Sequence, residues 1–296
     1  MSDWVIVGVP SSAGAHHAGQ ELAPDALRAA GLASRLAAAG LAVTDAGNLP
    51  GAVFAADREQ PQRRNLAGVV RVASEVADAV AGIAASGRLP LLLGGDCTIT
   101  LGAVAGLRRS RPGIGLVYVD GDADLSVPGD SGSGIFDSMG IAHLLGQGAP
   151  ELAALGGEPP LLDPARLAIV GSDPRETSDA ERRFLAEAGV SFQDAPALIG
   201  DPEGAARRAL EVVTAASDGV LVHFDVDTVD SGDLPLGNFP HYGSGVRLEH
   251  AIRCLRVLSA HPAFAGFVLT EVNPTHDPAG TELARLIDGL AAALAG

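Results

Sequence analysis

The sequence predicts an α/β fold, a three-layer αβα sandwich around a mostly parallel sheet, in a single domain over residues 1–296. Short runs rich in Val, Leu and Ile alternate with longer segments of helical spacing. The short runs are apolar throughout, which is typical of parallel strands that helices cover on both faces. No internal repeat, linker or sharp change of composition divides the chain.

The elements follow in order along the chain. Residues 4–10 are a predicted strand, and the alanine-rich segment 23–40 is a predicted helix that ends at glycine. A second strand at 41–47 precedes a helix at 65–87, which again ends at glycine. Further strands are expected at 89–96, 113–122, 166–173, 190–194, 219–227 and 264–274. Further helices are expected at 101–109, 138–146, 178–189, 203–216, 247–259 and 280–295.

Charge and composition exclude several classes of partner. The formal net charge of −16 repels a phosphate backbone, so we expect no nucleic-acid partner, and it suits a cationic substrate. The two cysteines, Cys97 and Cys254, make no disulfide framework, which fits a reducing cytoplasm. No apolar stretch approaches the length of a membrane span, and the first residues lack a signal-peptide pattern. We therefore expect a cytoplasmic protein with no membrane partner.

Polar side chains follow the predicted strands at the point where each strand ends. They are Asp96 and Cys97, then Asp120, Asp122 and Asp124, then Ser172 and Asp173, then Asp225, Asp227 and Asp230, and finally Glu271 and Asn273. Ligands bind at the carboxyl ends of the strands in open α/β sheets. Five strands that deliver acids to one edge therefore predict a functional site there.

The spacing of the aspartates predicts a metal site. Asp120, Asp122 and Asp124 are alternate residues, which on a strand would share one face, and Asp225 and Asp227 repeat the spacing. Carboxylates grouped in this way cannot all stay ionised without a cation. We predict two divalent ions that share bridging carboxylates. A solvated turn is the alternative for one such pattern, but two patterns and a thiol after a third strand favour metal.

Three motifs resemble those of the arginase/agmatinase/formiminoglutamase (ureohydrolase) family. The sequence has GGDCT (94–98), DGDAD (120–124) and DVDTVDS (225–231) where the family has GGDHS, DAHxD and DVDxxDP. The opening segment (8–32) and TEVNP (270–274) also resemble the family, so the likeness covers nearly the whole chain. It implies an arginase-like fold, a dimanganese pair, and a homo-oligomer, either a trimer or a hexamer.

The resemblance also implies a ligand set, with two departures. One metal would be held by Cys97, Asp120, Asp124 and Asp225, and the other by Asp120, Asp122, Asp225 and Asp227. Cys97 and Asp122 stand where the family has histidine ligands. Manganese is the first expectation by resemblance, although a thiolate favours zinc or iron. One thiolate and five carboxylates give two divalent ions an excess of two negative charges, which weakens their ability to acidify water. A small buried thiol after a tight turn remains the alternative for Cys97.

On the substrate side, the resemblance gives Glu271 as the partner of the guanidinium group, since a carboxylate accepts two parallel N–H bonds. Asp137 aligns with the family's proton-shuttling histidine and would need a shifted pKa for that role. Ser126, Ser131 and Ser133 align with positions that read the substrate carboxylate, and Asp173 with the aspartate that contacts its α-amino group. Serines in a glycine-rich loop are otherwise turn residues.

Five histidines receive separate interpretations. Alternative proton-transfer groups at the mouth of the cleft are His16, His17 and His241. His143 falls in a predicted helix and is interpreted as structural. We place His223 on the face of its strand opposite to Asp225, in the core or behind the ligands.

These features predict a metal-dependent hydrolase that cleaves a C–N bond of a small cationic guanidino compound and releases urea or hydroxyurea. Arginine and Nω-hydroxyarginine are the first candidates, followed by agmatine, guanidinobutyrate and formiminoglutamate. The alternative is a catalytically inactive arginase-fold protein that serves binding or assembly. The two missing histidines motivate it, while the five retained aspartates and Glu271 weigh against it.

Overall fold

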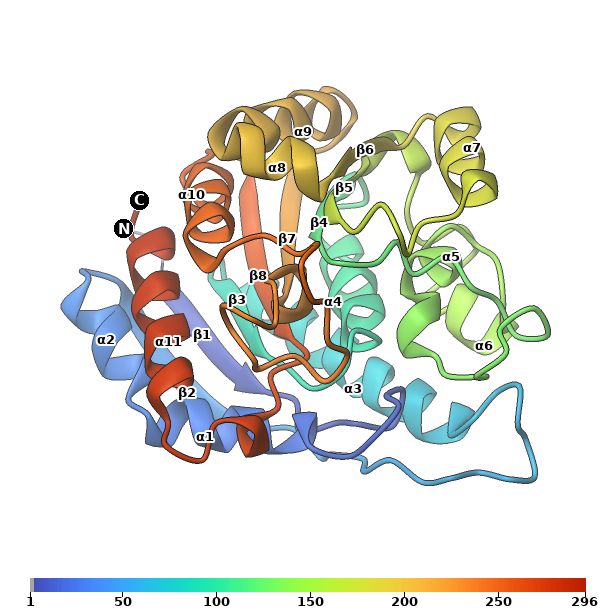
Figure 1. Ribbon diagram of the computed structural model, residues 1–296, viewed down its shortest axis with the longest axis horizontal. Helices are drawn as coiled ribbons and strands as arrows, with labels where there is room; N and C mark the ends of the chain where they lie inside the picture. Colours follow the sequence, from blue (N-terminus) through green and yellow to red (C-terminus); the bar gives the residue numbers. More distant parts are fainter. Residues whose placement is uncertain (1–2) are drawn as a thin grey trace.

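The computed structural model describes residues 3–296, and its centre is one eight-stranded sheet (Figure 1). The strands are β1 (Asp3–Gly8), β2 (Ala42–Asn48), β3 (Leu89–Leu93), β4 (Ile114–Val119), β5 (Leu167–Ser172), β6 (Ser191–Asp194), β7 (Gly219–Asp225) and β8 (Phe264–Thr270). Their order in the sheet is β2-β1-β3-β8-β7-β4-β5-β6, and all neighbours run parallel. The predicted parallel α/β sheet is therefore confirmed.

The helices complete the chain around this sheet. They are α1 (Ala23–Ala29), α2 (Leu32–Ala38), α3 (Leu66–Ala85), α4 (Ile99–Arg108), α5 (Gly140–Leu144), α6 (Pro150–Ala153), α7 (Asp179–Ala188), α8 (Ala195–Gly200), α9 (Pro202–Ala216), α10 (Leu248–Ser259) and α11 (Thr281–Leu294). Short 3-10 turns lie at Gln20–Leu22, Asp137–Met139, Pro164–Arg166, Val226–Thr228 and Pro274–His276. In residues 3–296 no helix is both long and apolar enough to cross a membrane.

Two helical layers enclose the sheet, because alternate residues of its central strands face opposite sides. Val117 and Val119 of β4 lie in one core with residues of α1, α2, α9, α10 and α11. Leu116 and Tyr118 lie in the other core with residues of α3, α4 and α5. Figure 1 shows these helices on the two sides of the sheet. The predicted three-layer sandwich is confirmed.

Some predicted boundaries were wrong. The expected helix at 23–40 is two helices, because Gly31 adopts a left-handed conformation (φ +87°) between them. The strands also end earlier than predicted, with β4 ending at Val119 and β8 at Thr270. Most of the polar residues that were assigned to strand ends therefore lie in the loops that follow. The sequence analysis did not anticipate α6 and α8.

Candidate metal centre

Four neighbouring strands deliver the polar residues to one place. β3, β8, β7 and β4 are consecutive in the sheet and parallel, so their carboxyl ends lie side by side. Cys97, Glu271, Asp225 and Asp120 lie at or just beyond these ends, and all four are buried. The structure thus brings together residues that are 174 positions apart at the extremes (271 − 97).

The two glycines after β3 permit a close approach of three chain segments. A Cβ atom on Gly94 would lie 2.2 Å from the carbonyl oxygen of Leu269, and one on Gly95 would lie 2.3 Å from that of Ser11. The Gly94 N–H donates to the Leu269 carbonyl (2.6 Å), and the Gly95 carbonyl accepts from the N–H of Glu271 (2.9 Å). No side chain fits here, and the turn carries Cys97 directly into the cluster.

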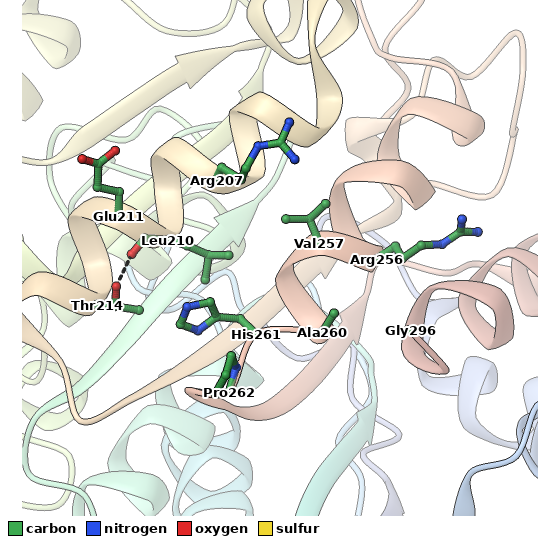
Figure 2. Close-up of a pocket in the computed structure, with 10 residues that line it drawn as sticks. All are labelled: Arg207, Leu210, Glu211, Thr214, Arg256, Val257, Ala260, His261, Pro262 and Gly296. Carbon is green, nitrogen blue, oxygen red and sulfur yellow. Dashed lines mark hydrogen bonds between the residues drawn. The ribbon is translucent and has the colours of Figure 1, made fainter.

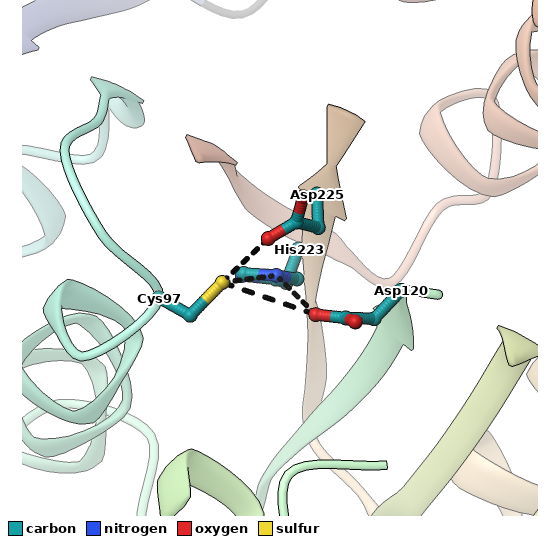
Figure 3. A group of neighbouring side chains, drawn as sticks. All are labelled: Cys97, Asp120, His223 and Asp225. Atoms are coloured by element: carbon teal, nitrogen blue, oxygen red, sulfur yellow. Dashed lines mark hydrogen bonds and ion pairs between the residues drawn. The ribbon is translucent and has the colours of Figure 1, made fainter. Parts of the chain in front are cut away.

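Cys97, Asp120, His223 and Asp225 form a first group of side chains, in which the sulfur of Cys97 faces the other three (Figure 3). Sγ of Cys97 donates to Oδ2 of Asp225 (2.7 Å) and lies 3.8 Å from Oδ2 of Asp120 and 3.7 Å from Nε2 of His223. Burial raises the pKa of the thiol well above its usual range, and the carboxylate of Asp225 raises it further. Without a cation, Cys97 is therefore a protonated thiol.

The predicted orientation of His223 was wrong. His223 and Asp225 are two residues apart on β7, and alternate strand residues share a face. Nε2 of His223 accordingly faces the cluster, 3.4 Å from Oδ2 of Asp120. Nδ1 is 2.8 Å from Oγ1 of Thr100, and the ring stacks on Tyr118 with a centroid distance of 4.0 Å. Burial lowers the pKa of His223 to about 3, so its imidazole is neutral.

Asp122, Asp227 and His241 form a second group. Nε2 of His241 is 3.6 Å from Oδ2 of Asp122 and 3.7 Å from Oδ2 of Asp227. The ring is buried, and its Nε2 has no hydrogen-bond partner. Burial opposes protonation of His241, but the two carboxylates prevail and raise its pKa to about 11. His241 thus reaches the carboxylates themselves and is not an exposed group at the mouth of the cleft.

Loop geometry, and not strand alternation, orients the aspartates after β4. The N–H of Asp122 donates to Oδ1 of Asp120 (2.7 Å), and the N–H of Asp227 donates in the same way to Oδ1 of Asp225 (2.7 Å). Asp124 has a left-handed backbone (φ +48°) and accepts a 2.5 Å hydrogen bond from the Tyr118 hydroxyl. Its carboxylate joins neither group of donors among the described residues, and its role as a ligand stays a prediction.

The charges of these groups fit a divalent cation. Burial raises the pKa of Asp120 and of Asp225 well above the usual range, and neighbouring carboxylates raise both further. The cost of burying them as anions disappears when a cation binds between them. Once an ion displaces their protons, carboxylate, thiolate and imidazole groups are also the donors that divalent metals use in proteins. The residues present therefore fit a metal.

Glu271 extends the cluster toward a substrate site. Its backbone is left-handed (φ +62°), a strained conformation that is held by the bond to Gly95. Oε2 accepts from Nε2 of Gln20 (2.8 Å), while the buried Oε1 has no partner. Cys97, Asp137 and Glu271 each offer one atom within 4.8 Å of the others. One oxygen of Glu271 is therefore available to a cation beside the metal ligands.

Asp137 lies on the same side of the cluster. Its Oδ1 accepts from the backbone N–H of Cys97 (2.8 Å). Burial raises the pKa of Asp137 well above its usual range, and the charge of Asp96 raises it further. Proton transfer near neutral pH needs a carboxyl group with such a shift.

The three serines predicted to bind the substrate carboxylate do not share one environment. Ser126 lines a cleft of about 220 Å³ that also reaches Asp122 and His16. Ser131 and Ser133 lie 3.0 Å apart through their hydroxyls, and both accept from backbone N–H groups of their own loop. Their present contacts fix a turn, and their role in reading a carboxylate stays a prediction.

Asp173 is buried and already has a cationic partner. Its Oδ2 lies 3.0 Å from Nη2 of Arg175, and it also accepts from Ser244. Burial favours the protonated acid, but the bonds from Arg175 and Ser244 outweigh it and hold the pKa of Asp173 at about 2. Oδ2 also lies 3.5 Å from Nδ1 of His241, which connects Asp173 to the second group.

Several residues that contact the cluster were not predicted from the sequence. Tyr118, Thr100, Gln20 and Arg175 were not singled out. Tyr118 had a signal, since the predicted strand at 113–122 would put it on the same face as Asp120. The interpretation of His143 as structural is consistent with its contacts, because Nδ1 is 2.7 Å from the Met139 carbonyl and Nε2 accepts from Ala149.

Larger clefts lie elsewhere on the molecule. One of about 600 Å³ lies between α9 and α10, where residues such as Thr214 and His261 precede β7 and β8 along the chain (Figure 2). Another, of about 680 Å³, is lined by residues 52–71 together with Ala13 and Glu151. Neither contains a group of metal donors. The chemistry of the acidic cluster, and not cleft size, therefore identifies the candidate site.

Comparison with known proteins gives one consistent likeness. The family model described as "Arginase family" matches residues 2–296. An arginase of Brevibacillus brevis is 30% identical over 275 residues, which are 92% of this chain and 91% of that protein. The structure of native arginase from Bacillus caldovelox superposes with a TM-score of 0.89 at 27% identity and covers 100% of this chain and 99% of its own. A Trypanosoma cruzi formiminoglutamase described with Mn2+ shares the fold, with a TM-score of 0.77, 18% identity and coverage of 99% and 93%.

Proposed function

The chain belongs to the arginase family of hydrolases, and we propose that it is a metal-dependent hydrolase that cleaves a C–N bond of a guanidino compound. The products are urea from an unmodified guanidinium group and hydroxyurea from an N-hydroxylated one. The acids needed for metal and for a cation lie around one cluster, which weighs against the alternative of an inactive binding protein.

The single observation that carries the proposal is the free oxygen of Glu271 beside the metal donors. Oε1 is buried without a partner, while Gln20 holds Oε2 in place. A planar guanidinium can donate parallel N–H bonds to a carboxylate, which gives it a fixed orientation. A guanidinium bound here would have its carbon next to the group around Cys97.

The residues proposed to hold two divalent ions are those that the sequence predicts. They are Cys97, Asp120, Asp124 and Asp225 for one ion, and Asp120, Asp122, Asp225 and Asp227 for the other. Divalent ions at such a site acidify water and so supply a nucleophile near neutral pH. Manganese is the first candidate by family, and the thiol of Cys97 makes zinc and iron the alternatives.

Asp137 is proposed to carry the proton that the leaving amine needs. Its pKa is raised well above the usual range of a carboxyl group, which is the direction that proton transfer near neutral pH requires. The bond from the N–H of Cys97 fixes its carboxyl group beside the cluster. Glu271 would orient the substrate while Asp137 transfers the proton.

We propose an amino-acid substrate, arginine or Nω-hydroxyarginine. Ser126 in the cleft, with Ser131 and Ser133 on the same loop, would meet the substrate carboxylate. Asp173 would meet the α-amino group, in competition with Arg175. That competition weakens the amino-group contact and makes agmatine the most informative comparison, because agmatine lacks the carboxylate.

A turnover panel tests the proposal. The protein is loaded separately with manganese, zinc and iron(II) and supplied with arginine, Nω-hydroxyarginine, agmatine, guanidinobutyrate and formiminoglutamate. We expect urea or hydroxyurea from one of the first two, and a loss of that product in Glu271→Gln. If no metal and substrate combination gives urea, hydroxyurea, ammonia or formamide, the proposed function is wrong.

A further inference from the structure

Each of the two donor groups contains one imidazole that the ligand set inferred from the family does not use. His223 lies in the group with Cys97, Asp120 and Asp225, and His241 lies in the group with Asp122 and Asp227. The family resemblance places histidine ligands at 97 and 122, where this chain has cysteine and aspartate. The chain therefore lacks an imidazole at each ligand position and has one nearby in space.

We propose that His223 and His241 are metal ligands, one at each ion, which supply the nitrogen donors that positions 97 and 122 no longer provide. This inference rests on the proposed metal-dependent function. It changes the donor set from sulfur and oxygen alone to one sulfur, two nitrogens and carboxylate oxygens. Such a mixture favours zinc or iron over manganese.

The distances around His223 suit a bound ion. Bonds of roughly 2.0–2.3 Å in a tetrahedral site separate neighbouring donor atoms by about 3.3–3.8 Å. Nε2 of His223 lies 3.4 Å from Oδ2 of Asp120 and 3.7 Å from Sγ of Cys97, and that sulfur lies 3.8 Å from Oδ2 of Asp120. The 2.7 Å contact of Sγ with Asp225 is shorter because a thiol proton occupies it. An ion in place of that proton would separate Sγ of Cys97 from Oδ2 of Asp225 to the spacing of two donors around one metal.

His223 is also held as a ligand should be. Metal-binding imidazoles commonly donate their second N–H to a nearby oxygen, which fixes the ring and leaves the other nitrogen for the metal. Nδ1 of His223 is 2.8 Å from Oγ1 of Thr100, and Tyr118 stacks on the ring. With the proton on Nδ1, the lone pair of Nε2 points at the cluster in Figure 3.

His241 has an independent indication. Its side chain is 2% exposed, and its Nε2 is buried without a hydrogen-bond partner. That nitrogen faces Asp122 at 3.6 Å and Asp227 at 3.7 Å, which are distances between donors around one ion and too long for hydrogen bonds. The other ring nitrogen, Nδ1, lies 3.5 Å from Oδ2 of Asp173, so a carboxylate also faces the ring on its far side.

Nitrogen NMR tests the proposal directly. Protein with ¹⁵N-labelled histidine is titrated with Zn²⁺, and the ring nitrogens of its eight histidines are recorded. We expect two rings to change to the shifts of zinc-bound Nε2. One of these signals should be absent from His223→Gln and the other from His241→Gln. In chelator competition each variant should bind its own ion at least about 10-fold more weakly, since even the loss of a partner behind a ligand costs that much.

His261→Gln is the matched control, since His261 lies in the cleft of Figure 2 between α9 and α10. It should bind zinc as the wild type does. If circular dichroism shows that a variant does not fold, the nitrogen NMR spectrum of the wild type still tests the proposal. Two bound zinc ions with all eight rings at their metal-free shifts would overturn this inference and leave the proposed function standing. No bound zinc would overturn this inference, and no bound divalent ion of any kind under any loading would overturn the proposed function as well.

Discussion

Cys97 is fixed by its surroundings before any metal is considered. Gly94 and Gly95 bring the chain between the loops after β1 and β8, and Asp96 anchors the turn by accepting from the N–H of Gly14 (3.0 Å). The thiol then faces two carboxylates and an imidazole. A side chain held this firmly can act as a metal donor without much reorganisation on binding.

Replacing the thiol should weaken metal binding without disturbing the fold. Cys97→Ser keeps the size of the side chain but removes the soft donor, so we expect zinc affinity to fall by more than about 10-fold. With cobalt(II) as a probe, the sulfur-to-metal absorption of the wild type should disappear. Cys254→Ser is the control, because Cys254 is buried in the core on α10. Unchanged cobalt spectra in Cys97→Ser would rule out Cys97 as a ligand.

Neutralising Glu271 should weaken substrate turnover and leave metal binding unchanged. Glu271→Gln removes the charge that would pair with a guanidinium, at a cost of about 2–5 kcal/mol of transition-state binding. Steady-state kinetics should show a fall in kcat/KM of about 30-fold or more, while elemental analysis shows the wild-type metal content. Glu249→Gln, on an exposed side chain of α10, is the control. Wild-type kcat/KM in Glu271→Gln would remove the basis of the proposed substrate site.

At the residue scale, the sequence predicted which acids meet but not how each is oriented. The D-x-D spacing brought Asp120 and Asp122 to one edge, yet their directions come from loop hydrogen bonds that spacing does not encode. The interpretation of His223 failed for a simpler reason, because two-residue periodicity places it with Asp225. His241 lies in a long loop without periodicity, so its contact with Asp122 could not be derived from the sequence.

At the element scale, small residues let helices pack closely against one another on the sheet. A Cβ atom on Gly102 of α4 would lie 2.3 Å from the carbonyl oxygen of Ala73 and 2.7 Å from Cβ of Val76, both on α3. The glycine therefore lets the backbone of α4 lie directly against the backbone and side chains of α3. α4 begins two residues after Cys97, so this packing also supports the turn that carries the thiol.

Enlarging the contact should destabilise the protein. Gly102→Ala forces α3 and α4 apart, and we expect a loss of about 1–3 kcal/mol in the free energy of unfolding, measured by denaturant titration. Gly82→Ala, at an exposed position in α3 with no atom within 4 Å of the new Cβ, should instead stabilise by about 0.5–1 kcal/mol. Equal effects of the two substitutions would contradict the close contact.

The inner strands were the most predictable, because each is a short apolar run, and β4, β5, β7 and β8 are buried at every residue. The edge strands β2 and β6 are mostly exposed or half-buried, and they were predicted from short runs between helical patterns. Their order in the sheet was not predictable, since β7 and β8 insert between β3 and β4 although they follow both in sequence. The break at Gly31 was missed because a glycine inside an alanine-rich helical pattern does not itself say that the backbone turns left-handed.

At the scale of the whole molecule, the sheet concentrates buried acids at one edge of a chain with net charge −16. The raised pKa values of Asp120 and Asp225 favour protonated acids in the metal-free protein, at the positions where the loaded protein would bind cations. Stability should therefore depend on pH in opposite ways with and without metal.

Since Asp120 and Asp225 have pKa values in the folded chain above the unfolded value of about 3.9, the native state binds more protons than the unfolded chain at pH values between the two. Without metal, the stability from these groups is full below that unfolded value and is lost as pH rises through the folded pKa values. In the presence of a chelator, Tm should therefore fall as pH rises. Saturating Zn²⁺ should reverse this dependence of Tm on pH, because ions replace protons.

Surface repulsion could contribute to the same trend, so the control must separate buried from exposed charge. High salt screens exposed charges and leaves buried ones largely unaffected. We expect the chelated slope to persist in salt and to become shallower in Asp225→Asn. A slope abolished by salt and unaffected by Asp225→Asn would assign the effect to the surface.

The metal content of the protein is the most direct test of a metal centre at this edge of the sheet. The chain is purified without added metal, loaded separately with manganese, zinc and iron, freed of excess ions, and measured by elemental analysis. The acidic edge of the sheet predicts about two divalent ions per chain for at least one metal. The absence of stoichiometric metal under every loading would contradict the metal centre and the hydrolase function proposed from it.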